Sequence, residues 1–77
     1  MKVETLRDIA LGAMRSYTKE IREKYGKEMK ANILVAGVAA RAGLDTCSTI
    51  LGLTQLVEEG KVIRESAGGT PVYILKE

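Results

Sequence analysis

The chain has 77 residues, of which 45% are hydrophobic and 29% are charged, and its formal net charge at pH 7 is +2. A chain this short accommodates one small core, so we expect a single domain over residues 1–77, and so small a net charge does not by itself indicate a polyanionic partner. The sequence has no histidine and one cysteine, Cys47, which excludes an internal disulfide and argues against zinc or general-base chemistry. We therefore expect a cytoplasmic protein that is not an enzyme and uses no metal, cofactor or small-molecule substrate.

A long amphipathic helix is predicted over residues 3–25. Apolar side chains recur there at steps of three and four, no proline interrupts the pattern, and Gly26 is suited to end the helix. The apolar stripe consists of Val3, Leu6, Ile9, Ala13, Tyr17, Ile21 and Tyr25. A helix of this length either covers the hydrophobic face of its own domain or pairs with a second copy in a homodimer, and the sequence favours neither use. The dimer contact would consist of Leu6, Ala10, Ala13, Tyr17 and Ile21.

Positive charge is concentrated in the first half of the chain. Residues 1–40 contain eight Lys or Arg against five Asp or Glu, whereas residues 41–77 contain four against five. The densest group of cations is Lys19, Arg22, Lys24, Lys27 and Lys30. Because glutamates interrupt this group, it indicates either a solvated helix face with ion pairs or a phosphate-binding patch.

Two shorter helices joined by a tight turn are predicted next. The second helix spans residues 35–42 with Val38, Ala39 and Ala42 facing inward, and Gly43 supplies the positive φ of the turn. Asp45 is a suitable N-cap for a third helix that ends near Glu59, before Gly60. With Leu53 facing inward, the helical period also turns Thr49, Ile50, Leu56 and Val57 inward. The longest apolar run, residues 33–40, is too short to cross a bilayer, so we expect no membrane partner.

A β-hairpin is predicted at the C-terminal end. Residues 61–66 and 72–76 are rich in β-branched side chains, and Gly68-Gly69 between them suits a hairpin turn. A short strand is also expected near residues 31–33. Alternation along the strands makes Val62, Tyr73 and Leu75 core candidates.

Residues 31–76 resemble the winged helix-turn-helix superfamily, in the style of small prokaryotic and archaeal transcription regulators. The pattern is Ile33, Val38, Ala39, Gly43, Leu44, Leu53, Leu56, Gly60, Val62, Tyr73 and Leu75. The resemblance implies an α+β fold of three helices and a C-terminal β-hairpin wing. It also implies sequence-specific binding of double-stranded DNA by a transcriptional regulator, with the third helix in the major groove. The implied base contacts are Cys47, Ser48, Leu51, Thr54 and Gln55, and the implied phosphate contacts are Arg41 and Arg64.

The same residues are also compatible with a second function. No Lys or Arg lies between Arg41 and Lys61, so the third helix has no cation of its own, and the second helix has an apolar outer face. These features favour the alternative of a winged-helix protein–protein adaptor that does not bind DNA. Leu51, which should point outward, fits a lone exposed leucine, a contact with a thymine methyl group, or a protein interface.

Overall fold

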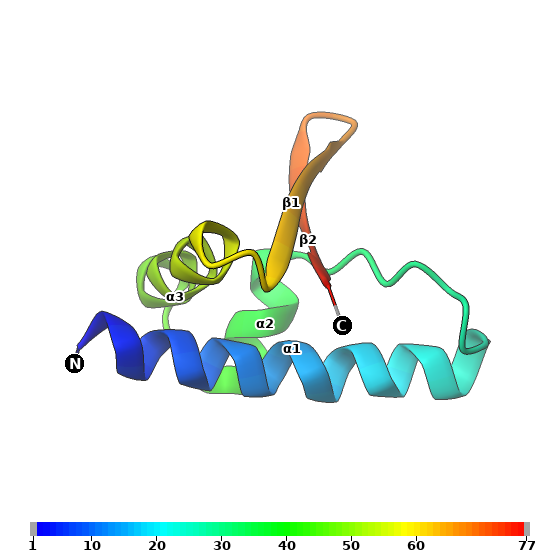
Figure 1. Ribbon diagram of the computed structural model, residues 1–77, viewed down its shortest axis with the longest axis horizontal. Helices are drawn as coiled ribbons and strands as arrows, with labels where there is room; N and C mark the ends of the chain where they lie inside the picture. The colour runs from blue at the N-terminus through cyan, green and yellow to red at the C-terminus, as the bar shows by residue number, and fades with distance from the viewer. Residues whose placement is uncertain (1, 77) are drawn as a thin grey trace.

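The computed structural model describes residues 2–76 and has the winged-helix layout of three helices followed by a two-stranded antiparallel hairpin, an α+β arrangement (Figure 1). The elements are α1 (Val3–Tyr25), α2 (Val35–Ala42), α3 (Thr46–Glu58), β1 (Val62–Ala67) and β2 (Thr70–Leu75). Helix α1 extends along the length of the molecule, α3 lies beside its first half, and the hairpin projects away from it. The α+β winged-helix layout expected from the sequence is therefore confirmed.

The bounds of α1 agree with the prediction, but its buried face is rotated from the predicted stripe. The buried side chains are Leu6, Ala10, Leu11, Ala13, Met14 and Thr18. Val3 and Tyr25, which belong to the predicted stripe, are exposed. At 100° per residue, Val3 and Tyr25 fall within the arc of the buried side chains, but they are the first and last residues of α1. The prediction was wrong at both ends of the helix because the ends of α1 are not covered by other elements, so Val3 and Tyr25 stay exposed.

Helix α3 crosses α1 closely at Gly52. A Cβ atom at this buried glycine would lie 2.6 Å from the carbonyl oxygen of Leu6 and 3.2 Å from the Cβ of Ala10. The residues of α3 that face α1 and the core are Thr49, Gly52, Leu53 and Leu56, at spacings of three, four and seven. Ile50, predicted to face inward, is instead 40% exposed, because α3 turns its glycine toward α1.

The turn between α2 and α3 forms as its sequence predicts. Gly43 has φ +67° in the left-handed region, and its N–H bonds the α2 carbonyl of Ala39. Asp45 is the N-cap of α3 and accepts a hydrogen bond of 3.2 Å from the backbone N–H of Ser48. The Thr49 hydroxyl donates to the carbonyl oxygen of Asp45 over 2.8 Å, so the first turn of α3 is fixed by side chains as well as by the backbone.

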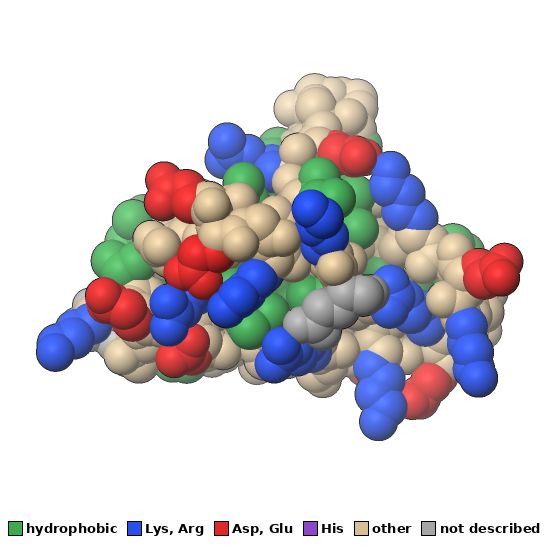
Figure 2. Space-filling view, in the orientation of Figure 1, with side chains coloured by type: hydrophobic (Ala, Val, Ile, Leu, Met, Phe, Trp, Pro, Cys, Tyr) green, Lys and Arg blue, Asp and Glu red, His purple; other side chains and the backbone are tan. Residues whose placement is uncertain are grey.

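The hairpin pairs Val62 with Leu75 at its base and Ala67 with Thr70 at its tip. The tip projects from the body of the molecule and has no charged side chain (Figure 2). Ile33 forms an isolated bridge to Tyr73, with N–H···O bonds of 2.9 and 2.8 Å, where a short strand was expected. This bridge makes β2 the inner strand, and its last four residues are buried, whereas β1 buries only its first.

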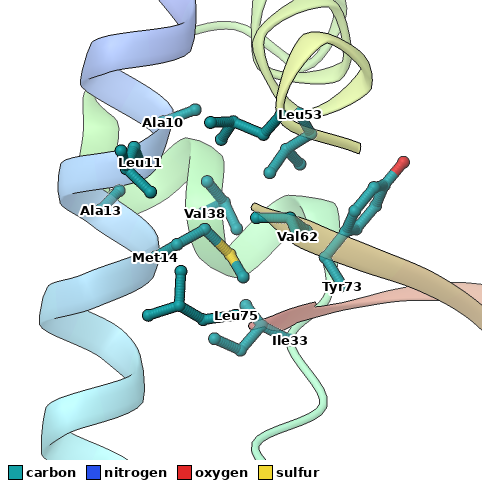
Figure 3. Packing of buried hydrophobic residues seen from close by; sticks show 11 residues of the cluster. Ala10, Leu11, Ala13, Met14, Ile33, Val38, Leu53, Val62, Tyr73 and Leu75 are labelled. Carbon is teal, nitrogen blue, oxygen red and sulfur yellow. The ribbon is translucent and has the colours of Figure 1, made fainter. Parts of the chain in front are cut away.

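The core lies where α1, α2, α3 and the base of the hairpin meet, and it is almost entirely aliphatic (Figure 3). Its members are Ala10, Leu11, Ala13, Met14, Ile33, Val38, Leu53, Leu56, Val62, Tyr73 and Leu75. The expected core positions Val62, Tyr73 and Leu75 are confirmed. Because this core holds α3 by one side only, the opposite side of α3 is left for other contacts.

Candidate nucleic-acid interface

The outer side of α3 is not covered by any other part of residues 2–76. Leu51 is 52% exposed, Cys47 is exposed, and Ser48 and Thr54 are partly exposed. Figure 2 shows hydrophobic side chains at the surface over this helix. The structure thus brings together four of the predicted base-contacting residues on one accessible face, at the foot of the projecting hairpin (Figure 1).

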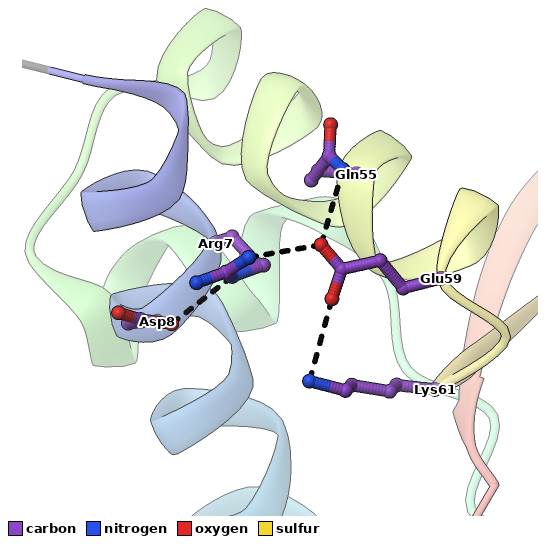
Figure 4. A network of polar contacts seen from close by, with 5 residues as sticks. All are labelled: Arg7, Asp8, Gln55, Glu59 and Lys61. Atoms are coloured by element: carbon purple, nitrogen blue, oxygen red, sulfur yellow. Dashed lines mark hydrogen bonds and ion pairs between the residues drawn. The ribbon is translucent and has the colours of Figure 1, made fainter.

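Gln55, the fifth predicted base contact, is engaged within the protein. Its side-chain amide donates a hydrogen bond of 3.0 Å to Glu59, which also accepts from Arg7 over 3.0 Å and pairs with Lys61 at 3.3 Å (Figure 4). These hydrogen bonds, from Gln55 and then Arg7, lower the pKa of Glu59 from 4.5 to about 2. A bidentate contact with adenine needs both the nitrogen and the oxygen of the amide, so Gln55 would first have to leave Glu59.

Ser48 also makes hydrogen bonds within its own helix, to the N-cap residue Asp45. Hydrogen bonds from its hydroxyl and then from its backbone N–H lower the pKa of Asp45 below the ordinary value. The Asp45 carboxylate therefore sits at the N-terminus of α3, where the helix would otherwise attract a phosphate. The end of α3 nearest the turn is thus closed to a phosphate by its own cap.

Arg41, a predicted phosphate contact, lies at the junction of α1 and α2. Its guanidinium is 2.7 Å from the Glu20 carboxylate and 4.3 Å from the centre of the Tyr17 ring. The same ring lies against Gly37, where an added Cβ would approach it to 2.6 Å. Glu20 already neutralises the charge of Arg41. Through Glu20 and Tyr17, the Arg41 side chain helps to hold α2 against α1. A phosphate at this position would have to compete with Glu20.

Arg64, the other predicted phosphate contact, is exposed on β1 opposite Tyr73. No carboxylate among residues 2–76 pairs with it, in contrast to its neighbours on the hairpin and linker. Lys61 pairs with Glu59 at 3.3 Å, and Lys30 pairs with Glu65 at 2.8 Å. Arg64 is therefore the hairpin cation best placed to meet an outside anion.

The residues predicted to pair two copies of α1 are used mainly inside one chain. Leu6, Ala10 and Ala13 are buried in the core, and Tyr17 and Ile21 are partly buried against it. Leu6, Ala10 and Ala13 are therefore not available for a dimer contact, whereas the contact through Tyr17 and Ile21 stays a prediction. A Cβ atom added at Gly12 would meet nothing within 4 Å, so that side of α1 is open.

Sequence reasoning missed two features of this region. The first is the network around Glu59, since Arg7 and Glu59 are 52 positions apart and the pattern gave no register between α1 and α3. The second is the exposure of Ile50 beside Leu51, which makes the outer side of α3 more apolar than expected. The small residue Gly52 was a usable signal for both, because a glycine inside a helix often marks close approach of another backbone.

Searches of known protein families, of curated protein sequences and of solved structures find no match to this chain. None of the helices described within residues 2–76 has the length and apolar character needed to cross a membrane.

Proposed function

We propose that the protein binds double-stranded DNA sequence-specifically and regulates transcription, with the outer side of α3 in the major groove and the hairpin beside it. One observation carries this proposal: the chain leaves that side of α3 uncovered next to a projecting hairpin. An α-helix fits the width of the major groove, and the winged-helix layout presents one in this way.

The exposed residues suggest how the duplex would be contacted. Leu51 can contact a thymine methyl group, and the hydroxyl of Thr54 can bond a base edge or a phosphate. Arg64, which has no carboxylate partner among residues 2–76, supplies a phosphate contact from the hairpin. Cys47 contributes a small contact surface at the start of the helix.

The charge of this surface sets the expected strength of binding. Helix α3 contains no Lys or Arg between Thr46 and Glu58, so few phosphates are neutralised. Each neutralised phosphate contributes about −0.9 to the slope of log K against log salt, so we expect a shallow slope of about −1 to −3. Discrimination between sequences then depends on base contacts more than on charge.

Fluorescence anisotropy with labelled genomic duplexes at several KCl concentrations tests the proposal. We expect saturable binding that Leu51→Asp abolishes and Arg64→Ala weakens for all sequences alike. Lys24→Ala is the matched control for Arg64→Ala, because Lys24 is a cation near the far end of α1. Absence of binding to every duplex at the lowest salt would contradict the proposal.

We propose further that the protein acts as a homodimer, paired through α1 side chains other than Leu6, Ala10 and Ala13. Two copies related by a two-fold axis would contact half-sites about one helical turn of DNA apart. Analytical ultracentrifugation measures this directly. A single species of 8.4 kDa at micromolar concentration would contradict the dimer without affecting the proposal for α3.

A protein–protein adaptor is the second candidate, and the apolar pair Ile50 and Leu51 favours it. They are 40% and 52% exposed on adjacent positions of a helix without cations, as a protein partner would require. If the protein is an adaptor, the wild type should bind no DNA duplex. Leu51→Asp should then abolish binding of the protein partner. Salt-sensitive duplex binding by the wild type favours DNA instead.

A further inference from the structure

A groove of about 810 Å³ lies beside the second half of α1, where the helix passes the end of β2 at Leu75. We call it the α1 groove and define it by the side chains of Arg15, Thr18, Lys19, Arg22, Glu23 and Lys27 that line it. In Figure 2, Lys and Arg side chains gather over this part of the helix. The α1 groove is separate from the outer side of α3, which lies beside the first half of α1 (Figure 1).

Helical spacing explains why these cations face the same way. Arg15, Lys19 and Arg22 are separated by four and three residues, so they project from one side of α1. Lys24, from the same run of sequence, projects to the other side, where it lies 5.4 Å from the centre of the Tyr25 ring and lines a different pocket. The basic cluster seen in the sequence is therefore divided between two faces, and only one of them forms the α1 groove.

Arg22 is the unusual residue of the α1 groove. Its side chain is partly buried, its Nε is buried without a hydrogen-bond partner, and no carboxylate within residues 2–76 pairs with it. Arg7 and Arg41 differ from Arg22 in this respect. Arg7 has the carboxylate of Glu59 at 3.0 Å, and Arg41 has that of Glu20 at 2.7 Å. Burying part of an unpaired guanidinium is unfavourable, and an anion relieves that penalty.

Thr18 adds an independent observation at the same place. This residue is 2% exposed, and its hydroxyl also lacks a hydrogen-bond partner. Buried polar atoms without partners are rare in folded proteins, and two of them lie along one groove here. Lys19, in turn, holds only a loose pair with Glu23 at 3.9 Å, with both side chains well exposed to solvent.

We infer that the α1 groove binds a compact, multiply charged phosphate compound, such as pyrophosphate or the phosphate chain of a nucleotide. Even with Arg15 left out of the count, the lining residues among 2–76 set three cations, Lys19, Arg22 and Lys27, against the single carboxylate of Glu23. The planar guanidinium of Arg22, held by its buried stem, can bond two phosphate oxygens, while Lys19 and Lys27 supply point charges. A recess beside one helix suits a small anion better than the broad backbone of a duplex.

A titration of the full-length, ¹⁵N-labelled protein with sodium pyrophosphate, followed by NMR at constant ionic strength, tests this inference. We expect saturable shifts of the amides of residues 15–27 and Leu75, and none with the same ionic strength of sodium chloride. Arg22→Gln should weaken the affinity by about tenfold, because a bidentate charged contact is lost. Lys24→Gln removes the same charge from the other face of α1 and should change the affinity by less than about twofold.

The following results of the titration would overturn the inference. Shifts that do not saturate, or equal losses in Arg22→Gln and Lys24→Gln, would show only diffuse attraction to a basic helix. If Arg22→Gln does not fold, Arg22→Lys retains the charge and the stem but not the planar fork, so undiminished pyrophosphate affinity in that variant would contradict the site. Stronger shifts of the same amides by a DNA duplex than by pyrophosphate would assign the groove to a DNA backbone instead.

Discussion

The outer side of α3 and the second half of α1 are both exposed, but they divide between them the properties that a DNA-binding surface usually combines. Helix α3 has an accessible shape next to a hairpin and contains no cation. The second half of α1 has Arg15, Lys19, Arg22 and Lys27 along one groove. Shape therefore points to one region and charge to another, so each must be tested with its own variants.

The same contrast holds for the pairing of individual cations. The arginines next to α3 and α2 have carboxylate partners, as in Arg7 with Glu59 and Arg41 with Glu20. Arg22 has none within residues 2–76. Paired arginines contribute to the fold, whereas an unpaired, partly buried one indicates a ligand, so the number of cations is a weaker guide than their partners.

The largest effect is expected where α3 crosses α1. Gly52→Ala places a Cβ against the carbonyl oxygen of Leu6 and should lower the free energy of unfolding by about 1–3 kcal/mol. Gly12→Ala is the matched control, because nothing lies within 4 Å of that position, and it should raise the free energy of unfolding by up to about 1 kcal/mol. Urea denaturation measures both, and equal stabilities of the two variants would contradict the close crossing.

Adding charge to the uncharged region should strengthen DNA binding. Leu51→Arg places a cation on the exposed side of α3, so we expect a steeper salt slope, by about one, and an affinity gain of about three- to tenfold at low salt. Tyr25→Arg adds the same charge at an exposed position at the end of α1. Equal gains from both variants, measured by fluorescence anisotropy, would mean that α3 does not approach the duplex.

Arg41 and Arg64 are both predicted from the sequence to contact phosphates, but their substitution should have different effects on stability and on DNA binding. Arg41→Ala removes the Glu20 pair and the Tyr17 contact, so we expect a loss of about 0.5–1 kcal/mol in the free energy of unfolding and an unchanged salt slope for DNA. Arg64→Ala should leave stability unchanged and make that slope shallower by about one. The reverse pattern would restore Arg41 as a phosphate contact.

The smallest effect concerns pH. Hydrogen bonds from Gln55 and Arg7 lower the pKa of Glu59 from 4.5 to about 2 in the folded protein, so its contribution to stability is present above pH 4.5 and is lost as pH falls toward 2. Glu59→Gln should therefore lose less stability than the wild type between about pH 5 and pH 2.5, measured by urea midpoints. Glu58→Gln is the control, and an identical pH response in both variants would contradict the network.

Local chemistry explains which parts of the fold were predictable. Gly43 with Asp45 specified the turn and the start of α3, and Gly68-Gly69 specified the hairpin, because positive φ and capping depend on neighbouring residues. The α1 bounds followed from an uninterrupted period. The rotation of α1 and α3 about their axes was not predictable in the same way, since it depends on Gly52 meeting Leu6 across a long stretch of sequence.

The candidate site was predictable in position but not in the state of its side chains. The period of α3 placed Leu51 and Cys47 outward, which the structure confirms. It did not indicate that Gln55 bonds Glu59 or that Arg41 pairs with Glu20, because those partners are brought together by tertiary packing. Charge clusters in a sequence likewise do not show which cations share a face.

An NMR titration of the labelled protein with an unlabelled specific duplex tests the central claim most directly. Contact through α3 and the hairpin predicts the largest amide shifts at Cys47, Leu51, Thr54 and Arg64, with smaller shifts in the second half of α1. Shifts confined to residues 15–27, with α3 unchanged at saturation, would contradict the account.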